Sequence, residues 1–210
     1  TRAEAASGLR FRRALSGRPV HFYSNDPERD AQAEEDLRGC YLAAGFDAYA
    51  ASVSRGDPGG DLRAYENFCV LCALRRGKRG VAGLNETITR RLRPRLSGAS
   101  GYDSPWYHGR PVMVTENDYG LGIFNGDIGI TLLGKDGRLE VWFSDREGNI
   151  RSVPPPSLPA HQTAFAVTVH KAQGSEFENA ALVLPEQDLP VLTRELIYTA
   201  VTRVKRRLAI

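Results

Sequence analysis

The densest cluster of polar residues in the chain occupies positions 168–177, which read TVHKAQGSEF and lie between the apolar runs 165–167 and 180–184. His170 and Lys171 offer hydrogen-bond donors to a phosphate group, and Gly174 lets the backbone approach a ligand closely. Glu176 can accept a hydrogen bond from a sugar hydroxyl. The segment therefore predicts a binding site for a phosphate-bearing ligand, with a capped surface turn of solvated charges as the alternative.

The elements around this segment follow the alternating order of an α/β protein. A surface loop is expected at residues 55–61, where turn residues gather. The pattern of apolar residues predicts strands at 18–24, 46–53, 68–74 and 180–184, and the start of a strand at 208–210 that the chain end interrupts. It predicts helices at 31–42, 81–93 and 192–203. The 81–93 helix has an apolar face made by Val81, Leu84, Ile88 and Leu92.

A different composition separates residues 95–159 from the rest of the chain. Glycines recur there between short β-rich runs at 111–115, 128–133, 138–143 and 150–153. This spacing predicts a small β-barrel or curled sheet inserted into the α/β layer. The three prolines at 154–156 are expected to close it and to form a stiff connector back to the α/β layer.

Composition and charge limit the class of protein. No run approaches the roughly 18 apolar residues of a membrane span, so we expect a soluble, cytoplasmic protein without a membrane partner. The net charge of +3 is uneven, with +7 over residues 71–100, +4 over 191–210 and −8 over the remainder.

Cys69 and Cys72 have the spacing of zinc ligands, but no further Cys or His completes the set and a strand would point them to opposite faces. No metal site is predicted.

Two motifs carry a family resemblance. The segment 168–177 resembles motif V, and YTAVTR at 198–203 resembles motif VI, of superfamily 1 DNA helicases in the branch of the exodeoxyribonuclease V alpha subunit, RecD. Five further stretches are similar to the C-terminal region of that subunit: LCALR at 71–75, GVAGLNE at 80–86, GRPVM at 109–113, GIFNGDIG at 122–129 and TREL at 193–196. The resemblance covers residues 65–210 closely and 1–64 loosely.

The resemblance implies a fold and a set of partners. The fold is a second RecA-like motor lobe with the parallel sheet of P-loop NTPases, at residues 1–105 and 163–210. A small Src-homology-3-like β-barrel interrupts it at 106–162. ATP and Mg²⁺ would bind between this lobe and a first motor lobe of the same polypeptide. Single-stranded DNA and the larger helicase and nuclease subunits of exodeoxyribonuclease V are the other implied partners, in double-strand-break repair and recombination.

The resemblance also implies roles for individual residues. Arg203 matches the catalytic arginine that reaches the γ-phosphate of ATP. Gln173, Gly174 and Glu176, together with Arg203, would face the nucleotide. Thr168, His170 and Lys171 would face single-stranded DNA. The alternatives are a helix-end cation for Arg203 and a structural histidine for His170.

The sequence lacks the other half of an ATP site. No Gly-x-x-x-x-Gly-Lys-Ser/Thr occurs, and no Asp-Glu pair follows an apolar strand. We therefore expect this chain to be the C-terminal part of a helicase subunit, inactive and without tightly bound cofactor when alone. A stand-alone RecD-like, Pif-type or conjugative relaxase helicase is the first alternative, and a non-catalytic nucleic-acid-binding module is the second. A phosphate-loop motif upstream in the same reading frame would exclude the second.

Overall fold

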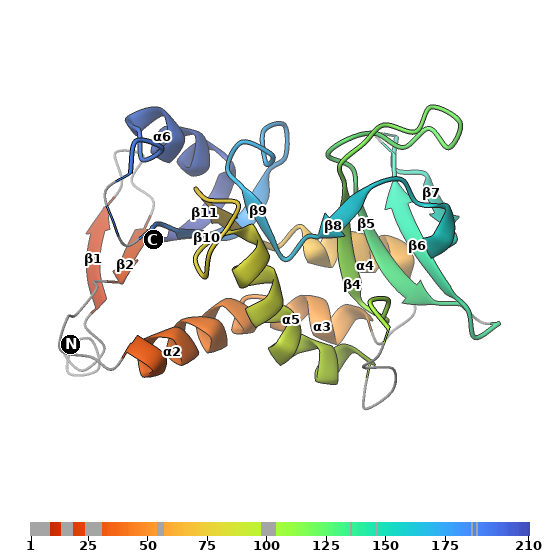
Figure 1. Ribbon diagram of the computed structural model, residues 1–210, viewed down its shortest axis with the longest axis horizontal. Coiled ribbons are helices and arrows are strands. Elements are labelled where there is room, and N and C mark those ends of the chain that lie inside the picture. Colours follow the sequence, from red (N-terminus) through yellow and green to blue (C-terminus); the bar gives the residue numbers. More distant parts are fainter. Residues whose placement is uncertain are drawn as a thin grey trace.

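The computed structural model describes residues 9–13, 19–23, 31–53, 57–97, 104–134, 136–145, 147–185, 187 and 189–210, and their side chains from residue 38 onward. The described elements form two β-sheets with helices packed on both faces of the first sheet (Figure 1). The sequence also predicts that the first helix begins at Asp26-Pro27, where Asp26 can cap and proline suits the first turn, but these two residues lie outside the described part of the chain. None of the described helices is both long and apolar enough to cross a bilayer.

The first sheet has six strands in the order β1-β2-β11-β10-β3-β9. Only β1 and β2 are antiparallel, and every other neighbouring pair is parallel. The strands are β1 Leu9–Arg13, β2 Pro19–Tyr23, β3 Phe68–Cys72, β9 Ala166–Thr168, β10 Phe177–Val183 and β11 Val204–Ala209. The predicted strands at 18–24, 68–74 and 180–184 are confirmed, whereas the last strand begins at Val204, directly after a helix, and not at 208.

Helices cover both faces of this sheet. They are α2 Ala31–Ala44, α3 Asp47–Val53, α4 Pro58–Tyr65, α5 Val81–Ser97 and α6 Arg194–Thr202. Figure 1 shows α2, α3 and α5 on one side of the sheet and α6 on the other. The four residues predicted as the apolar face of the 81–93 helix are all buried in α5.

Cys69 and Cys72 are free thiols that pack into clusters on opposite faces of the first sheet. Burial raises the pKa of both thiols, that of Cys72 to about 12.

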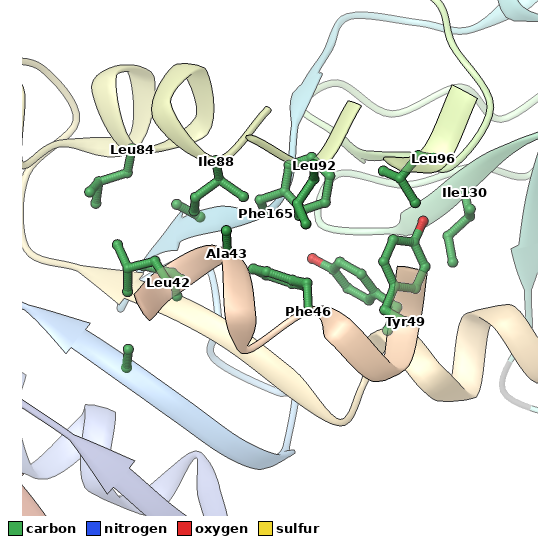
Figure 2. Packing of buried hydrophobic residues seen from close by; sticks show 14 of the residues in the cluster. Leu42, Ala43, Phe46, Tyr49, Leu84, Ile88, Leu92, Leu96, Ile130 and Phe165 are labelled. Carbon is green, nitrogen blue, oxygen red and sulfur yellow. The ribbon is translucent and has the colours of Figure 1, made fainter. Parts of the chain in front are cut away.

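The prediction of a strand at 46–53 is wrong, because residues 47–53 form the helix α3. The segment's buried residues Phe46, Tyr49 and Val53 recur every three or four positions, which is the spacing of one helix face. Figure 2 shows Phe46 and Tyr49 directed toward Ile88, Leu92 and Leu96 of α5. Phe46, Tyr49 and Val53 favour a strand, but the three alanines of the segment favour a helix, and packing against α5 uses the helical spacing.

The predicted loop at 55–61 is also partly wrong. Residues 54–56 lie outside the described part, but Pro58 begins α4 with Asp57 in the N-cap position. Proline suits the first helical turn because its missing N–H has no partner there in any helix. Asp61 in that turn is fully buried and accepts a hydrogen bond from Ser52 Oγ at 2.6 Å, which ties α4 to α3.

The second sheet is antiparallel throughout and has the order β7-β6-β5-β4-β8. Its strands are β4 Arg110–Val114, β5 Ile128–Leu133, β6 Leu139–Ser144, β7 Ile150–Val153 and β8 His161–Thr163. It has a core of its own: Val112, Val114, Ile123, Val141, Phe143 and Val153. The four predicted strands are confirmed, whereas the Src-homology-3-like barrel and the domain bounds at 106 and 162 stay predictions.

The proline run does not lead back to the first sheet as expected. Pro155–Ser157 form a short 3-10 helix, η1, and the chain then pairs β8 with β4 in the second sheet. The crossing to the first sheet comes later, at the fully buried Ala164 and Phe165. β8 was missed because three half-buried residues give no strand pattern of their own.

Direct contacts hold the two sheets in place relative to each other. Ile130 and Leu132 of β5 belong to the same buried cluster as α3, α4 and α5. The Tyr49 hydroxyl donates a 2.9 Å hydrogen bond to the Gly109 carbonyl before β4, and the Tyr65 hydroxyl donates to the Ala164 carbonyl at the crossing. The second sheet is therefore packed onto the helical layer and not tethered by a free linker.

Candidate nucleic-acid interface

A cleft of about 1020 Å³ lies between the two sheets, lined by α5, the turn after β3, the end of β9 and one side of the second sheet. Five of its lining residues are cations and one is acidic. The cations are Arg75, Arg90, Arg93, Arg110 and Lys171, and the acid is Glu86. We call this feature the basic cleft. The uncharged polar lining is Asn85, Thr89, Thr115, Asn125, Gln162, Thr163 and Thr168.

Strand register brings the turn after β3 and the turn after β9 together. β3 and β9 are parallel neighbours, with Cys72 opposite Thr168, so both strands end at the same edge of the sheet. Arg75 therefore lies close to Lys171, although 96 positions of sequence separate them. Partial burial lowers the pKa of Lys171, and the charge of Arg75 lowers it further. Two cations held together favour an anion between them.

The arginines of the cleft are held by specific contacts. The Arg93 guanidinium lies 4.6 Å from the ring centre of Tyr107 and donates to the Ser104 carbonyl at 2.8 Å. Arg110 lies 4.7 Å from the ring centre of Trp106, and its Nε donates to Thr163 Oγ1 at 3.1 Å. Both arginines line the cleft, so these contacts fix positive charge at its wall.

Burial and neighbouring charge both affect the charged residues that line the cleft. The pKa of Arg110 is lowered by burial and, to a smaller degree, by the charge of Arg93. The one acid of the cleft lining, Glu86, forms an ion pair on the exposed face of α5, with its Oε1 3.1 Å from Arg90 Nη2. The cleft therefore keeps an excess of positive charge after its internal ion pair is counted, which suits a polyanion.

A second group of predicted residues meets at the opposite edge of the sheet. Arg203 ends α6 and directly precedes β11, while Glu176 directly precedes β10. The Arg203 Nη1 lies 3.5 Å from the Ser175 carbonyl oxygen, and the Phe177 N–H donates to the Arg203 carbonyl at 2.8 Å. We call Gly174, Ser175, Glu176 and Arg203 the Arg203 turn.

The Arg203 turn has features of an anion site. Gly174 has a φ of +91°, and a Cβ there would meet no atom within 4 Å, so backbone conformation and not space selects glycine. Arg203 Nε is buried and has no hydrogen-bond partner among the described residues. Glu176 forms a 3.4 Å ion pair with exposed Lys205. The guanidinium of Arg203 as a whole is only half-buried, and a guanidinium suits the phosphate oxygens of a nucleotide.

The structure divides the predicted site residues between two places. Thr168 and Lys171 line the basic cleft, and the Thr168 Oγ1 accepts a hydrogen bond from the Lys171 N–H at 3.3 Å. Gly174, Glu176 and Arg203 meet at the Arg203 turn. His170 and Gln173 are exposed between the two places and line neither, with the Gln173 N–H donating to the His170 carbonyl at 3.3 Å.

Sequence reasoning missed most of the cleft. Arg75, Arg90 and Arg93 belong to the basic stretch 71–100, whose charge was visible but whose position was not. Arg110, Asn125 and Gln162 come from the second sheet, and only pairing of the two sheets brings them to the cleft. In the described part of the chain, no cluster of three or more His, Cys, Asp and Glu side chains could hold a metal ion.

Comparison with known proteins assigns the class. Residues 163–210, which hold both the end of the cleft and the Arg203 turn, match the UvrD-like helicase C-terminal domain. The chain is therefore similar to the C-terminal part of superfamily 1 helicases.

Within this superfamily the sequence is similar to the C-terminal region of RecD. Identity to the RecBCD enzyme subunit RecD is 43% over 140 residues in Haemophilus influenzae and 39% over 197 residues in Mycolicibacterium smegmatis. These matches cover 67% and 94% of this chain. Identity to the ATP-dependent RecD2 DNA helicase of Deinococcus radiodurans is 37% over 138 residues. The chain spans 20% and 33% of the length of the two RecD subunits and 19% of the RecD2 helicase.

Two solved structures align with this chain at low sequence identity and low TM-score. A Pif1 helicase from Bacteroides in complex with ADP-AlF3 and single-stranded DNA aligns with a TM-score of 0.44 and 15% identity, covering 89% of this chain and 50% of the other. A Pif1 helicase from Candida albicans aligns with a TM-score of 0.45 and 12% identity, covering 87% and 55%.

Proposed function

We propose that this chain is the second motor lobe of an ATP-dependent DNA helicase, the C-terminal part of an exodeoxyribonuclease V alpha subunit. One observation carries the proposal: a single short segment, 168–176, begins in the basic cleft and ends at the Arg203 turn. A polyanion in the cleft and a nucleotide at the turn would therefore contact the same stretch of backbone. An ATPase that is driven by DNA needs a physical connection of this kind between its DNA site and its nucleotide site.

On the DNA side, the cleft would hold the phosphates of a single strand. Lys171 and Arg75 supply paired charge from the first sheet, and Arg110 supplies a stacked guanidinium from the second. Such contacts bind the backbone without reading the base sequence. A motor that moves along any sequence requires this kind of grip.

On the nucleotide side, Arg203 would act as the catalytic arginine. Its guanidinium is anchored beside the Ser175 carbonyl, and its buried Nε has no partner among the described residues. A positioned guanidinium neutralises charge that grows on the phosphoryl group in the transition state. The phosphate loop and the Mg²⁺ ligands would come from a first lobe, because the chain has neither motif.

Residues 168–176 would connect the two events. Successive turns fill the segment, in which the Ala172 N–H donates to the Thr168 carbonyl and the Ser175 N–H donates to the Ala172 carbonyl, both at 3.1 Å. A segment closed by successive turn hydrogen bonds is more constrained than an open loop, so a shift at one end would be felt at the other. Gln173 lies midway between the two ends with an exposed side chain, and we infer that it couples them.

The relatives extend the proposal to an assembly and a pathway. The RecD relatives are subunits of the RecBCD enzyme, so the intact protein would work with larger helicase and nuclease subunits in double-strand-break repair. The RecD2 helicase match favours a stand-alone helicase as the second candidate. Co-purification of the full-length protein with two larger subunits supports the first candidate, and its absence supports the second.

The test is DNA-stimulated ATP hydrolysis by the full-length protein and its Gln173→Ala variant. We expect wild type to hydrolyse ATP faster with single-stranded DNA, and the variant to bind DNA normally but lose most of the stimulation. Arg138→Ala, on the exposed hairpin between β5 and β6, is the control. Absence of DNA-dependent hydrolysis in wild type would overturn the motor assignment, and full stimulation in the variant would overturn the coupling role of Gln173.

A further inference from the structure

The loop between β4 and β5, residues 115–127, carries two exposed aromatic rings beside the basic cleft. Tyr119 is 81% exposed and Phe124 is 45% exposed. Their ring centres lie 5.9 Å apart with an interplanar angle of 74°. This aromatic loop is the long green loop at the upper right of Figure 1. Large aromatic rings left in water at a loop tip point to a ligand that covers them.

The aromatic loop is held in one conformation. Asp118 and Ile123 exchange two backbone hydrogen bonds, at 2.7 and 2.9 Å, and the fully buried Ile123 anchors the loop in the core of the second sheet. The Arg151 guanidinium donates to the carbonyl oxygens of Leu121 and Gly122. A fixed loop presents its rings without a large loss of entropy on binding.

A chain of hydrogen bonds connects the rings to the wall of the cleft. Asn125 lines the cleft and accepts a 3.5 Å hydrogen bond from Lys171 Nζ. The Asn125 N–H donates to Asn117 Oδ1 at 2.8 Å, and Asn117 Nδ2 donates to the Tyr119 hydroxyl at 3.5 Å. The rings therefore lie within two side chains of a cation that lines the cleft.

Two of the three acids of the loop are engaged by its own backbone and are not directed at a ligand. Asp118 Oδ1 accepts the Leu121 N–H at 2.9 Å, and Asp127 Oδ2 accepts the Phe124 N–H at 2.8 Å. Both carboxylates are thus directed into the loop backbone. Glu116 is the remaining acid of the loop and is exposed, whereas Lys171 faces the loop from the cleft.

We propose that Tyr119 and Phe124 form a base-stacking site for a single strand whose phosphates lie in the basic cleft. The proposal rests on the proposed function for the phosphate contacts, and it adds the bases as the second recognised part of the strand. Every nucleobase has a π-face, so stacking on exposed aromatic rings adds affinity without sequence preference. The perpendicular arrangement of the rings lets one ring stack on a base while its neighbour contacts the base edge.

The test compares two labelled probes in anisotropy titrations of the full-length protein. One is an oligo-dT strand, and the other is an abasic strand of equal length, which has the same phosphates and no bases. The Tyr119→Ala/Phe124→Ala variant should lose about tenfold in affinity for oligo-dT, the scale of one lost stacking contact, and be unchanged for the abasic strand. Tyr119→Phe should bind as wild type. Tyr41→Ala, an exposed aromatic residue of α2, is the matched control, and melting curves check that each variant folds.

The outcomes separate the two proposals. Equal binding of both strands by wild type, with strong salt dependence, would overturn base stacking and leave the phosphate cleft standing. An equal loss for both probes in the double variant would also overturn it, because the rings would then act on the backbone or on the loop. Absence of salt-dependent binding to either probe would overturn the proposed function itself.

Discussion

The Arg203 guanidinium lies 3.5 Å from the carbonyl oxygen of Ser175, although 28 residues of sequence separate the two. The two residues meet because β10 and β11 are parallel neighbours that begin at the same edge of the sheet. The residue before β11 is therefore placed beside the turn before β10. The first prediction depends on this contact.

Replacing Arg203 with Ala in the full-length protein should lower kcat for ATP by about a thousandfold or more, while KM changes little. The reason is that the guanidinium would act on charge that develops in the transition state. Steady-state hydrolysis at saturating DNA measures the effect, and Arg203→Lys is the matched variant that keeps the charge without the fork. An unchanged kcat would assign Arg203 to the role of a helix-end cation.

The paired cations of the cleft predict a change in salt dependence. Arg75→Ala/Lys171→Ala should weaken binding of single-stranded DNA and reduce the slope of log K against log salt by about 1.4, the value for two lost phosphate contacts. Anisotropy at several salt concentrations measures it, with Arg138→Ala as the control. A slope equal to that of wild type would show that neither residue contacts a DNA phosphate.

His170 gives a separate prediction, because it is exposed and lies outside the lining of the cleft. His170→Ala alone should reduce DNA affinity less than Lys171→Ala does. The same titrations compare the two variants. A larger loss of DNA affinity in His170→Ala than in Lys171→Ala would mean that the DNA strand runs outside the cleft, over the turn that His170 occupies.

The 210-residue chain alone should show no ATP hydrolysis above background, with or without DNA. An arginine and a turn cannot organise the reaction without a phosphate loop and magnesium ligands. A coupled assay on the purified chain measures it, with the full-length protein as the positive control. DNA-stimulated turnover by the chain itself would contradict the assignment of half an ATP site.

Asn85 should be important for stability. Its side chain donates to the Ala166 carbonyl at 2.8 Å and accepts the Ala166 N–H at 3.0 Å, which fixes α5 to the edge strand β9. Asn85→Ala leaves both buried backbone groups unpaired, so the free energy of unfolding should fall by about 2–4 kcal/mol. Denaturant titration measures it. Glu86→Ala, one residue along and exposed, should change stability by less than about 0.5 kcal/mol, and an equal effect of both variants would contradict this role.

Much of the local structure followed from sequence alone. The apolar spacing of Val81, Leu84, Ile88 and Leu92 predicted α5, and the continuous apolar run at 68–74 predicted the strand that the structure shows as β3, residues 68–72. The polar segment 168–177 was identified as a site, because so many polar residues between two buried strands make poor core. These features depend on neighbours within one or two turns of chain, which the sequence displays directly.

Other features required the tertiary structure. Residues 47–53 form a helix because the spacing of Phe46, Tyr49 and Val53 lets one helix face pack against α5, a partner that is distant in the sequence. The basic cleft depends on the alignment of Cys72 with Thr168 and on the packing of β5 against the helical layer, which bring Arg75, Lys171 and Arg110 to one surface. Strand register and sheet packing are long-range choices, set by the sum of many weak contacts between distant segments. No local pattern of residue types encodes them, so only the folded chain shows which charges share a cleft.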